Sequence, residues 1–396
     1  MHLEAQAIVL AAGPGMRMTT LTNHTPKCLL PVGTLPMVCY PLQILQEAGF
    51  SEVTVVVSGG EEQRMSKVVE QYGLKLNLDI APVNTSHDPG TADSLRHIAS
   101  KIKRSVDDVV IVTSDLVTDA KLQPIMDQHR SSGAALTMLT ANQQPEFLKA
   151  TPPGPKTKPT INNDVICTQS KTGRLMYAVA GGDYDEVISL HNRVMKSAKS
   201  LNVSTSTVDA HLYIMKRWLV DYILSKESLC GEMGSLKAEI LPHIISRQFT
   251  KEPIKQRSER KLDPSFGQSF QMHSLFEQVY PNSAWSIKHP SADVQEKAQV
   301  SDDSLIGSGS VICEKTNITS SVIGNHCRIN SFVRILNCAL GDHITIAPGC
   351  VIENSLIAAN VERKCTIKNC IVTDPNKIEE NKTYTNEILE AVQDFA

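Results

Sequence analysis

Residues 8–32 read IVLAAGPGMRMTTLTNHTPKCLLPV, and this stretch decides the fold of the first half of the chain. An apolar run ends in Gly-Pro-Gly at 13–15, Arg17 follows, and Pro-Lys at 26–27 precedes a second apolar run. Because glycine has no Cβ, a buried strand that runs into a glycine turn lets backbone N–H groups approach phosphate oxygens closely. Arg17 and Lys27 would add the positive charge that a triphosphate needs.

Two well-known phosphate-binding patterns are excluded for this turn. No Gly-Lys-Ser/Thr follows, so it is not a Walker A loop, and the spacing is not Gly-x-Gly-x-x-Gly. The remaining alternative is a plain strand, turn and helix without a ligand. The positions of Arg17 and Lys27 favour the phosphate-binding turn over that alternative.

Length and composition limit the classes of protein to consider. A chain of 396 residues is expected to form two or three domains. Hydrophobic residues make up 41% and charged residues 20%, as in soluble globular proteins. The net charge of −3 gives no reason to expect direct nucleic-acid binding. The start has no basic region before its apolar run, and no apolar stretch is long enough to span a membrane, so we expect neither a signal peptide nor a membrane partner.

The ten cysteines include no Cys-x-x-Cys pair. Six of them lie between residues 313 and 370, within a repeated region where we expect them to be small packing residues. A metal site is the alternative, but the ligand spacing typical of one is missing. We predict no metal and a reduced, cytosolic protein.

The first half of the chain alternates strand-like and helix-like segments. This alternation predicts an α/β domain with a doubly wound, mostly parallel sheet. Ligands of such sheets bind at the carboxyl ends of the strands, where Gly13, Gly15 and Asp115 are all expected. The expected strands are residues 53–57, 109–112, 134–139 and 208–215, and the expected helices are residues 61–71, 94–102, 121–130 and the apolar stripe from 236 to 245.

An internal repeat begins near residue 304. The segments SLIGSGSVICEKTNITS, SVIGNHCRINSFVRILN and CALGDHITIAPGCVIEN align with a period of seventeen residues. This period resembles the hexapeptide repeat of left-handed parallel β-helices, in which one aliphatic residue per short strand points inward. A series of β-hairpins is the alternative, although hairpin turns would not keep a near-constant spacing. The expected inward residues are Ile306, Ile312, Ile318, Ile323, Ile329, Ile335, Leu340, Ile346, Ile352 and Ile357.

These patterns predict four segments. We expect the α/β domain over residues 1–249, a linker over 250–297, the β-helix over 298–375 and an acidic tail over 376–396.

The glycine turn, Pro-Lys and Leu-Leu-Pro-Val closely resemble the signature of sugar-phosphate nucleotidyltransferases. Gly-Thr-Ala at 90–92 is a second such feature, and the resemblance implies that it contacts the base and ribose. Ser-Asp at 114–115 is the third, and the family places a carboxylate that binds Mg²⁺ there. The alternative for Asp115 is a capping role after a strand. The predicted residual nucleotide pocket comprises Gly13, Gly15, Arg17, Lys27, Gly90 and Asp115.

Other parts of that family's active site are absent from the sequence. The Glu-Lys-Pro whose lysine meets the sugar phosphate does not occur between residues 164 and 180. The family's Asn-Ala/Ser-Gly is replaced by Asp209-Ala210-His211, and neither tryptophan begins the Trp-x-Asp-x-Gly that supplies a second metal ligand. We therefore predict no catalytic residues, no cofactor and at most weak residual nucleotide binding.

The whole chain resembles a narrower family. A nucleotidyltransferase-like domain, a linker and a hexapeptide β-helix occur together in GDP-mannose pyrophosphorylases and in two subunits of the guanine-nucleotide exchange factor of eukaryotic translation initiation factor 2. The chain is similar to the gamma subunits of that factor over most of its length, and departs from them between about 250 and 286, where it looks shorter. The segments that carry the resemblance are PGTADSLR (89–96), SDLVTD (114–119), VDAHLY (208–213), EILP (239–242) and SLIG (304–307).

The resemblance implies a non-catalytic regulatory or structural subunit. Its implied partners are an epsilon-type catalytic subunit, the other subunits of the exchange factor, and the initiation factor 2 G-protein complex. The epsilon subunit carries a helical-repeat exchange domain after its β-helix, and no such pattern follows the repeat here. A sugar-phosphate nucleotidyltransferase similar to GDP-mannose pyrophosphorylase remains the alternative.

Overall fold

The structure is a computed structural model. It describes residues 5–22, 25–83, 90–143, 153–155, 163–181, 192–197, 200–225, 228–248, 268–271, 288–374, 376 and 378–390.

A seven-stranded sheet forms the centre of the first domain. Its order is β12-β7-β11-β6-β1-β4-β5, and every neighbouring pair is parallel except the two that involve β11. This confirms the predicted mostly parallel sheet. The central strands β1, β4 and β6 are largely apolar because both faces of the sheet are covered there; all six residues of β1 are buried. In this order, the strands are Gln268–Gln271, Leu136–Asn142, Thr207–Lys216, Asp108–Thr113, Ala5–Leu10, Glu52–Ser58 and Asn77–Val83.

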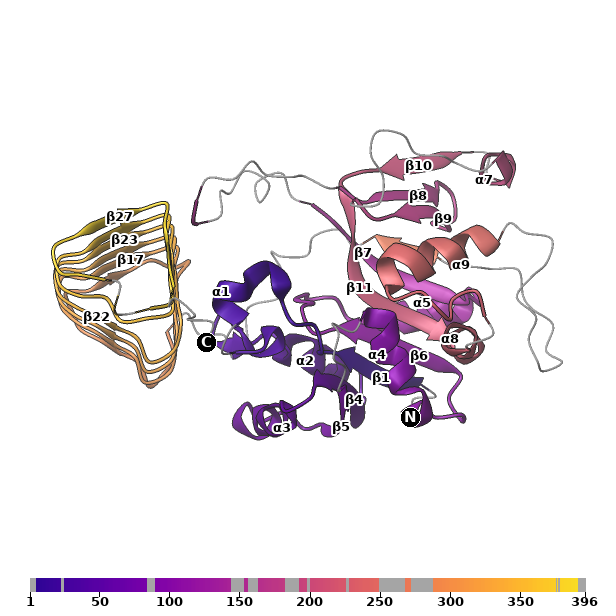
Figure 1. Cartoon of the computed structure of the whole chain (residues 1–396), viewed down its shortest axis with the longest axis horizontal. Coiled ribbons are helices and arrows are strands. Elements are labelled where there is room, and N and C mark those ends of the chain that lie inside the picture. The colour runs from indigo at the N-terminus through magenta and orange to yellow at the C-terminus, as the bar shows by residue number, and fades with distance from the viewer. Residues whose placement is uncertain are drawn as a thin grey trace, which may run out of the picture.

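Helices pack on both faces of this sheet, as the doubly wound prediction requires (Figure 1). One apolar cluster contains residues of α4, α8 and α9, and the other contains residues of α2, α3 and α5. The α-helices are α1 Thr19–Thr22, α2 Cys39–Glu47, α3 Glu62–Gln71, α4 Thr91–His97, α5 Leu122–Ser131, α7 Asn192–Ser197, α8 Arg217–Leu224 and α9 Leu241–Arg247. The 3-10 helices η1, η2 and η3 span Met16–Met18, Lys27–Leu29 and Ala99–Lys101, and a π-helix, η4, spans Leu236–Ile240.

Two small sheets flank the central one. The strands β10 (Leu201–Ser204), β8 (Val165–Gln169) and β9 (Leu175–Val179) form an antiparallel sheet. The strands β2 (Pro31–Val32) and β3 (Leu35–Pro36) form a short hairpin.

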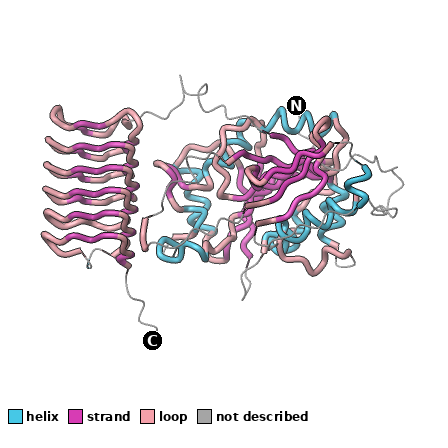
Figure 2. The backbone as a smooth tube through the Cα atoms, turned by 90° about the horizontal axis from the view of Figure 1, so that it is seen from above, coloured by secondary structure: helices cyan, strands magenta, loops and turns pink. Residues whose placement is uncertain are grey.

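The second domain is a parallel β-helix with three faces, seen as a stack of coils in Figure 2. The first face consists of β13 Asp293–Val294, β16 Val311–Ile312, β19 Arg328–Ile329 and β22 Thr345–Ile346. The second consists of β14 Gln299–Val300, β17 Asn317–Thr319, β20 Arg334–Leu336, β23 Val351–Glu353, β25 Thr366–Lys368 and β27 Thr383–Thr385. The third consists of β15 Leu305–Ile306, β18 Val322–Ile323, β21 Ala339–Leu340, β24 Leu356–Ile357, β26 Ile371–Val372 and β28 Ile388–Leu389.

The predicted inward residues are confirmed. All ten are buried, and they belong to one apolar cluster. Ladder partners on successive coils, such as Ile312 and Ile329, are seventeen residues apart. Each aliphatic therefore stacks on its equivalent in the next coil, and together they form the core of the left-handed β-helix.

The predicted end points of the β-helix are wrong in two places. The coils begin at β13, before residue 298, and continue through β27 and β28, which lie in the predicted acidic tail. The sequence did not predict the last coils because the spacing between inward residues falls from seventeen to fifteen between Ile352 and Ile367. In addition, Tyr384 stands where the pattern expects an aliphatic residue.

The predicted linker over 250–297 lies mostly outside the described residues. Within it, β12 adds an edge strand to the central sheet by pairing with β7. Residues 288 onward already belong to the β-helix region, where Lys288 bridges to Ile306.

The cysteines of the β-helix behave mainly as packing residues. Five of the six are buried in its apolar cluster, whereas Cys313 is half-buried. Burial raises the pKa of the Cys327, Cys338 and Cys350 thiols to about 11, so they stay protonated. All ten cysteines are free thiols, and no group of three metal-ligating side chains occurs among the described residues.

The third face of the β-helix lies toward the first domain (Figures 1 and 2). A Cβ added at Gly33, in the β2–β3 hairpin, would lie 3.7 Å from Leu305 Cδ1. At Gly154 the backbone N–H donates to the Asn369 carbonyl at 2.7 Å. The outward residues of this face are all apolar: Leu305, Val322, Ala339, Leu356, Ile371 and Ile388.

None of the helices in the described part of the chain is long and apolar enough to cross a membrane.

Candidate functional site

The glycine turn follows β1 at the carboxyl edge of the sheet. Gly15 has a φ of +73°, and a Cβ there would lie 2.7 Å from Thr22 Cγ2, so the turn requires glycine. Gly13 is exposed, and no heavy atom lies within 4 Å of an added Cβ, which leaves its backbone open to a ligand. The backbone of Arg17 lies in η1, but its side chain falls outside the described residues.

Lys27 and Asp115 are brought together although they are 88 positions apart. Strands β1 and β6 are parallel neighbours, with Leu10 opposite Thr113, so the segments that follow them share one edge. Lys27 Nζ lies 2.5 Å from Asp115 Oδ2. Burial alone would raise the pKa of Asp115, but hydrogen bonds from Lys27 and Thr113 outweigh that effect and lower it. The predicted phosphate-binding cation and metal-binding carboxylate therefore neutralise each other in this state.

Gly90 lies directly before α4 and packs against another backbone segment. A Cβ there would lie 2.1 Å from the Gly234 carbonyl oxygen, which also accepts from Ala92 N at 2.9 Å. Thr91 Oγ1 accepts from Leu236 N at 2.9 Å. The Gly-Thr-Ala segment thus joins α4 to η4, and Gly90 is required there by close backbone packing.

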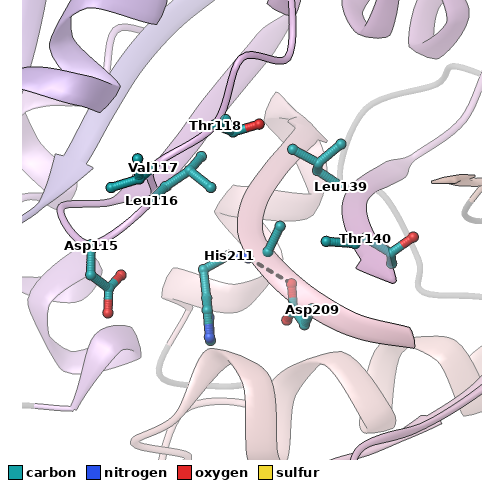
Figure 3. A pocket seen from close by; sticks show the side chains of 10 residues that line it. Asp115, Leu116, Val117, Thr118, Leu139, Thr140, Asp209 and His211 are labelled. Carbon is teal, nitrogen blue, oxygen red and sulfur yellow. Dashed lines mark hydrogen bonds between the residues drawn. The ribbon is translucent and has the colours of Figure 1, made fainter. Parts of the chain in front are cut away.

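A cavity of about 310 Å³ opens beside Asp115 (Figure 3). Apart from Arg17, whose side chain is not described, Asp115 is the one predicted pocket residue among those that line it. Its walls are largely apolar, with two carboxylates, two threonines and a histidine as polar residues. The lining residues are Asp115, Leu116, Val117, Thr118, Leu139, Thr140, Ala141, Asp209, Ala210 and His211.

His211 stands where the resembled enzymes have glycine, and its backbone is left-handed, with a φ of +59°. Strand β11 is irregular here, because its register against β7 shifts between Asp209 and Tyr213. Asp209 Oδ1 accepts from His211 N at 2.8 Å, and Oδ2 accepts from the Tyr213 hydroxyl. Burial raises the pKa of Asp209 and also that of Tyr213. The Asp209 carboxylate is thus held by the chain's own donors in this bulge.

Two polar residues near the cavity escaped the sequence prediction. Asp164, just before β8, is buried, and its Oδ2 lies 2.7 Å from Lys237 Nζ. Asp209 N lies 3.5 Å from the same carboxylate oxygen. The contact joins residues 73 positions apart, so no local motif could have indicated it.

Comparison with known proteins agrees with this architecture. Residues 6–147 match the family model described as nucleotidyl transferase, and residues 285–384 match the one described as the EIF2B subunit epsilon LbH domain. Translation initiation factor eIF2B subunit gamma of Caenorhabditis elegans is 32% identical over 255 residues. That of Schizosaccharomyces pombe is 26% identical over 255 residues. The chain is similar to eIF2B gamma subunits.

The alignments with these two gamma subunits cover 63% of this chain and only 59% and 53% of the relatives. A second group of relatives consists of enzymes. Mannose-1-phosphate guanylyltransferase of Mycobacterium tuberculosis is 22% identical over 354 residues, which is 88% of this chain and 83% of the enzyme. The two groups correspond to the two functions that the sequence suggests.

Proposed function

We propose that this chain is a non-catalytic regulatory and structural subunit of a translation initiation guanine-nucleotide exchange factor. It would promote GDP-to-GTP exchange on the initiation-factor G protein together with a catalytic epsilon-type subunit, in the cytosol. The observation that carries the proposal is the similarity to gamma subunits combined with an LbH domain of the eIF2B type in the same chain. The other subunits of the factor and the G-protein complex are the proposed partners.

The site geometry supports a regulatory role over nucleotidyl transfer. Lys27 and Asp115 are paired with each other, and Asp209 is bound to Tyr213 and His211. A transferase would need such groups free to hold a metal and the transferring phosphoryl group.

The exchange role is tested by release of a fluorescent GDP analogue from the G-protein complex. We expect no acceleration by this chain alone, because the proposal assigns catalysis to the partner. Added to the epsilon-type subunit, the chain should raise the rate about twofold or more, since a second docking surface increases the productive fraction of encounters. Strong activity of the single chain, or no gain in the mixture, would contradict the proposal.

The second candidate is a sugar-phosphate nucleotidyltransferase, favoured by the alignment with the mycobacterial enzyme over most of both chains. It predicts pyrophosphate release from GTP or UTP with hexose 1-phosphates. The proposed regulatory role predicts none, and one assay distinguishes the two.

We further propose that the glycine turn keeps weak nucleotide affinity through Gly13, Gly15, Arg17, Lys27 and Gly90. Calorimetry with GTP and ATP, with and without Mg²⁺, measures it. Arg17→Ala and Lys27→Ala should each weaken binding about tenfold, the usual effect of losing a charged hydrogen bond.

Asp115→Asn offers a sharper version of the same test. It removes the carboxylate that competes for Lys27, so it should strengthen binding of Mg²⁺-free nucleotide. Lys67→Ala, an exposed charge removed from α3, is the matched control and should leave binding unchanged. Affinity that is indifferent to Arg17→Ala would remove this pocket from consideration.

A further inference from the structure

The β-helix has three vertices, at which one face turns into the next. Different residues occupy the turns at each vertex. Most of the turns contain a residue with a left-handed backbone, a conformation that glycine and asparagine adopt most readily. Between the second and third faces, these positions are Ser320, Asn337, Asn354, Asn369 and Asn386. The asparagine side-chain amides form a ladder, with Asn337 Nδ2 donating to Asn354 Oδ1 at 2.9 Å. This vertex is explained by the fold alone.

The vertex between the first and second faces is different. Its left-handed positions are Lys315, Phe332, Gly349, Lys364 and Asn381. Phe332 has a φ of +63°, and the residue is 62% exposed. A bulky side chain is strained in this conformation. Because the exposed ring buries little apolar surface, burial does not offset that strain. Asparagine adopts this left-handed conformation more readily, as it does at the neighbouring vertex. The fold alone therefore does not explain why phenylalanine occupies this position.

One cation covers the exposed ring, and others lie on the same and neighbouring coils. Lys315 Nζ lies 4.8 Å from the ring centroid and covers one face. Arg328 precedes the turn on the first face and Arg334 follows it on the second, and both are exposed. In the described part of the chain, no carboxylate forms an ion pair with Lys315, Arg328, Arg334 or Lys364, while nearby Glu314 is paired with Lys297 at 3.3 Å. We call Lys315, Arg328, Phe332, Arg334 and Lys364 the Phe332 vertex.

The next coil has no side chain at the equivalent position, because Gly349 stands there. Gly349 occupies the vertex in the next coil, and Lys364 the coil after that, with its Cγ only 3.2 Å from where a Cβ of Gly349 would lie. The Lys364 stem therefore packs over the Gly349 backbone, and the exposed Phe332 ring provides the apolar surface of this vertex.

We propose that the Phe332 vertex binds an acidic peptide segment of a partner protein, with one apolar side chain seated beside Phe332 and carboxylates on Arg328 and Arg334. Complementary charge favours this occupant, since the four cations lack acidic partners among the described residues. A nucleic-acid strand fits less well, because the cations span only about four coils, and the exposed Glu314 and Glu362 interrupt any longer positive track. The vertex lies on the side of the β-helix remote from the first domain, where a partner can reach it (Figure 1). This inference does not depend on the proposed function.

The partner segment is identified by photo-crosslinking. Phe332 is replaced by p-benzoylphenylalanine in the full chain, produced in its own cells, and the cross-linked peptide is sequenced by mass spectrometry. The same replacement at Asn381 is the control, since it lies on the same vertex, with the same backbone conformation, three coils away. We expect a cross-link to one acidic segment from position 332 and not from position 381. No cross-link above the control, a segment without acidic residues, or an RNA adduct would each overturn the proposal.

The cross-linked segment, made as a synthetic peptide, is then titrated with the full chain. Phe332→Asn should weaken binding tenfold or more while the melting temperature stays equal or rises, because asparagine relieves the backbone strain. Arg328→Ser with Arg334→Ser should weaken binding as strongly and reduce its salt dependence, because only Lys315 and Lys364 then remain. Arg104→Ser, an exposed charge removed from the first domain, is the control and should leave affinity unchanged. Equal affinity of Phe332→Asn and the parent chain would contradict the assignment.

Discussion

Ile346→Asp is expected to unfold much of the β-helix. Ile346 is fully buried and stacks on Ile329 in the neighbouring coil. The aspartate would place an unpaired charge in an apolar core and would also remove the packing of the isoleucine. We expect a loss of more than about 4 kcal/mol in the free energy of unfolding, which for a domain of this size lowers the melting temperature by about 10 °C or more. Ile329→Asp should behave in the same way.

The adjacent residue provides the control. Thr345 lies on the same strand, β22, but its side chain points outward and is exposed. Because side chains alternate along a strand, Thr345→Asp adds the same charge in the same coil without burying it. It should cost less than about 1 kcal/mol. Thermal unfolding of the full chain, followed by circular dichroism, compares the variants, and buried variants that melt like the parent would show that these side chains do not point inward.

The β-helix core was predictable because its signal is local. One inward aliphatic recurs every five or six residues, and ladder pairs such as Ile329 and Ile346 follow directly from the seventeen-residue period. Where the period changes, the prediction fails. The fifteen-residue step between Ile352 and Ile367 breaks the period before the last coils. In the next coil Tyr384 replaces the aliphatic residue that the pattern requires.

The candidate site was predictable only in part, because its contacts are long-range. The motif placed Lys27 and Asp115 at one edge of the sheet, and parallel pairing of β1 with β6 brings them there. Neither motif predicted that Lys27 and Asp115 would form an ion pair with each other, at 2.5 Å. The Asp164–Lys237 contact has no sequence signal at all, since it depends on how η4 packs beside β8.

His211 replaces the glycine of the family motif, and the structure shows how the backbone accommodates this change. The sequence indicated that replacing glycine would change the backbone freedom of this position. The structure shows that the left-handed conformation is kept, at a φ of +59°, with His211 N donating to Asp209. The aspartate that replaces asparagine therefore supports the backbone conformation that the glycine would otherwise provide.

Asp108→Ala should cost the first domain about 3 kcal/mol. Asp108 begins β6 and is buried, with Lys216 Nζ at 2.7 Å, Arg130 Nε at 3.0 Å and His129 Nε2 at 3.4 Å from its carboxylate oxygens. Removing one partner of a buried charge cluster leaves the remaining charges uncompensated. The cost falls at the lower end of the usual range because Lys216 and Arg130 keep partial access to water. Asp221→Ala is the control: its exposed carboxylate pairs with Arg217 within one helix, and its loss should cost less than about 0.5 kcal/mol.

The pH dependence of stability gives a second readout of Asp108. Burial alone would raise its pKa, but His129, Lys216 and Arg130 outweigh that effect and hold the pKa well below its usual range. A carboxyl group whose pKa is lower in the folded than in the unfolded state stabilises the fold above its unfolded pKa, about 3.9, and loses that contribution as the pH falls through the folded value. Denaturant unfolding from pH 7 to pH 2 should therefore show a constant difference between the parent and Asp108→Asn above about pH 5, which shrinks below about pH 4. A difference that stays the same down to pH 2 would show that the ionised Asp108 contributes nothing specific to stability.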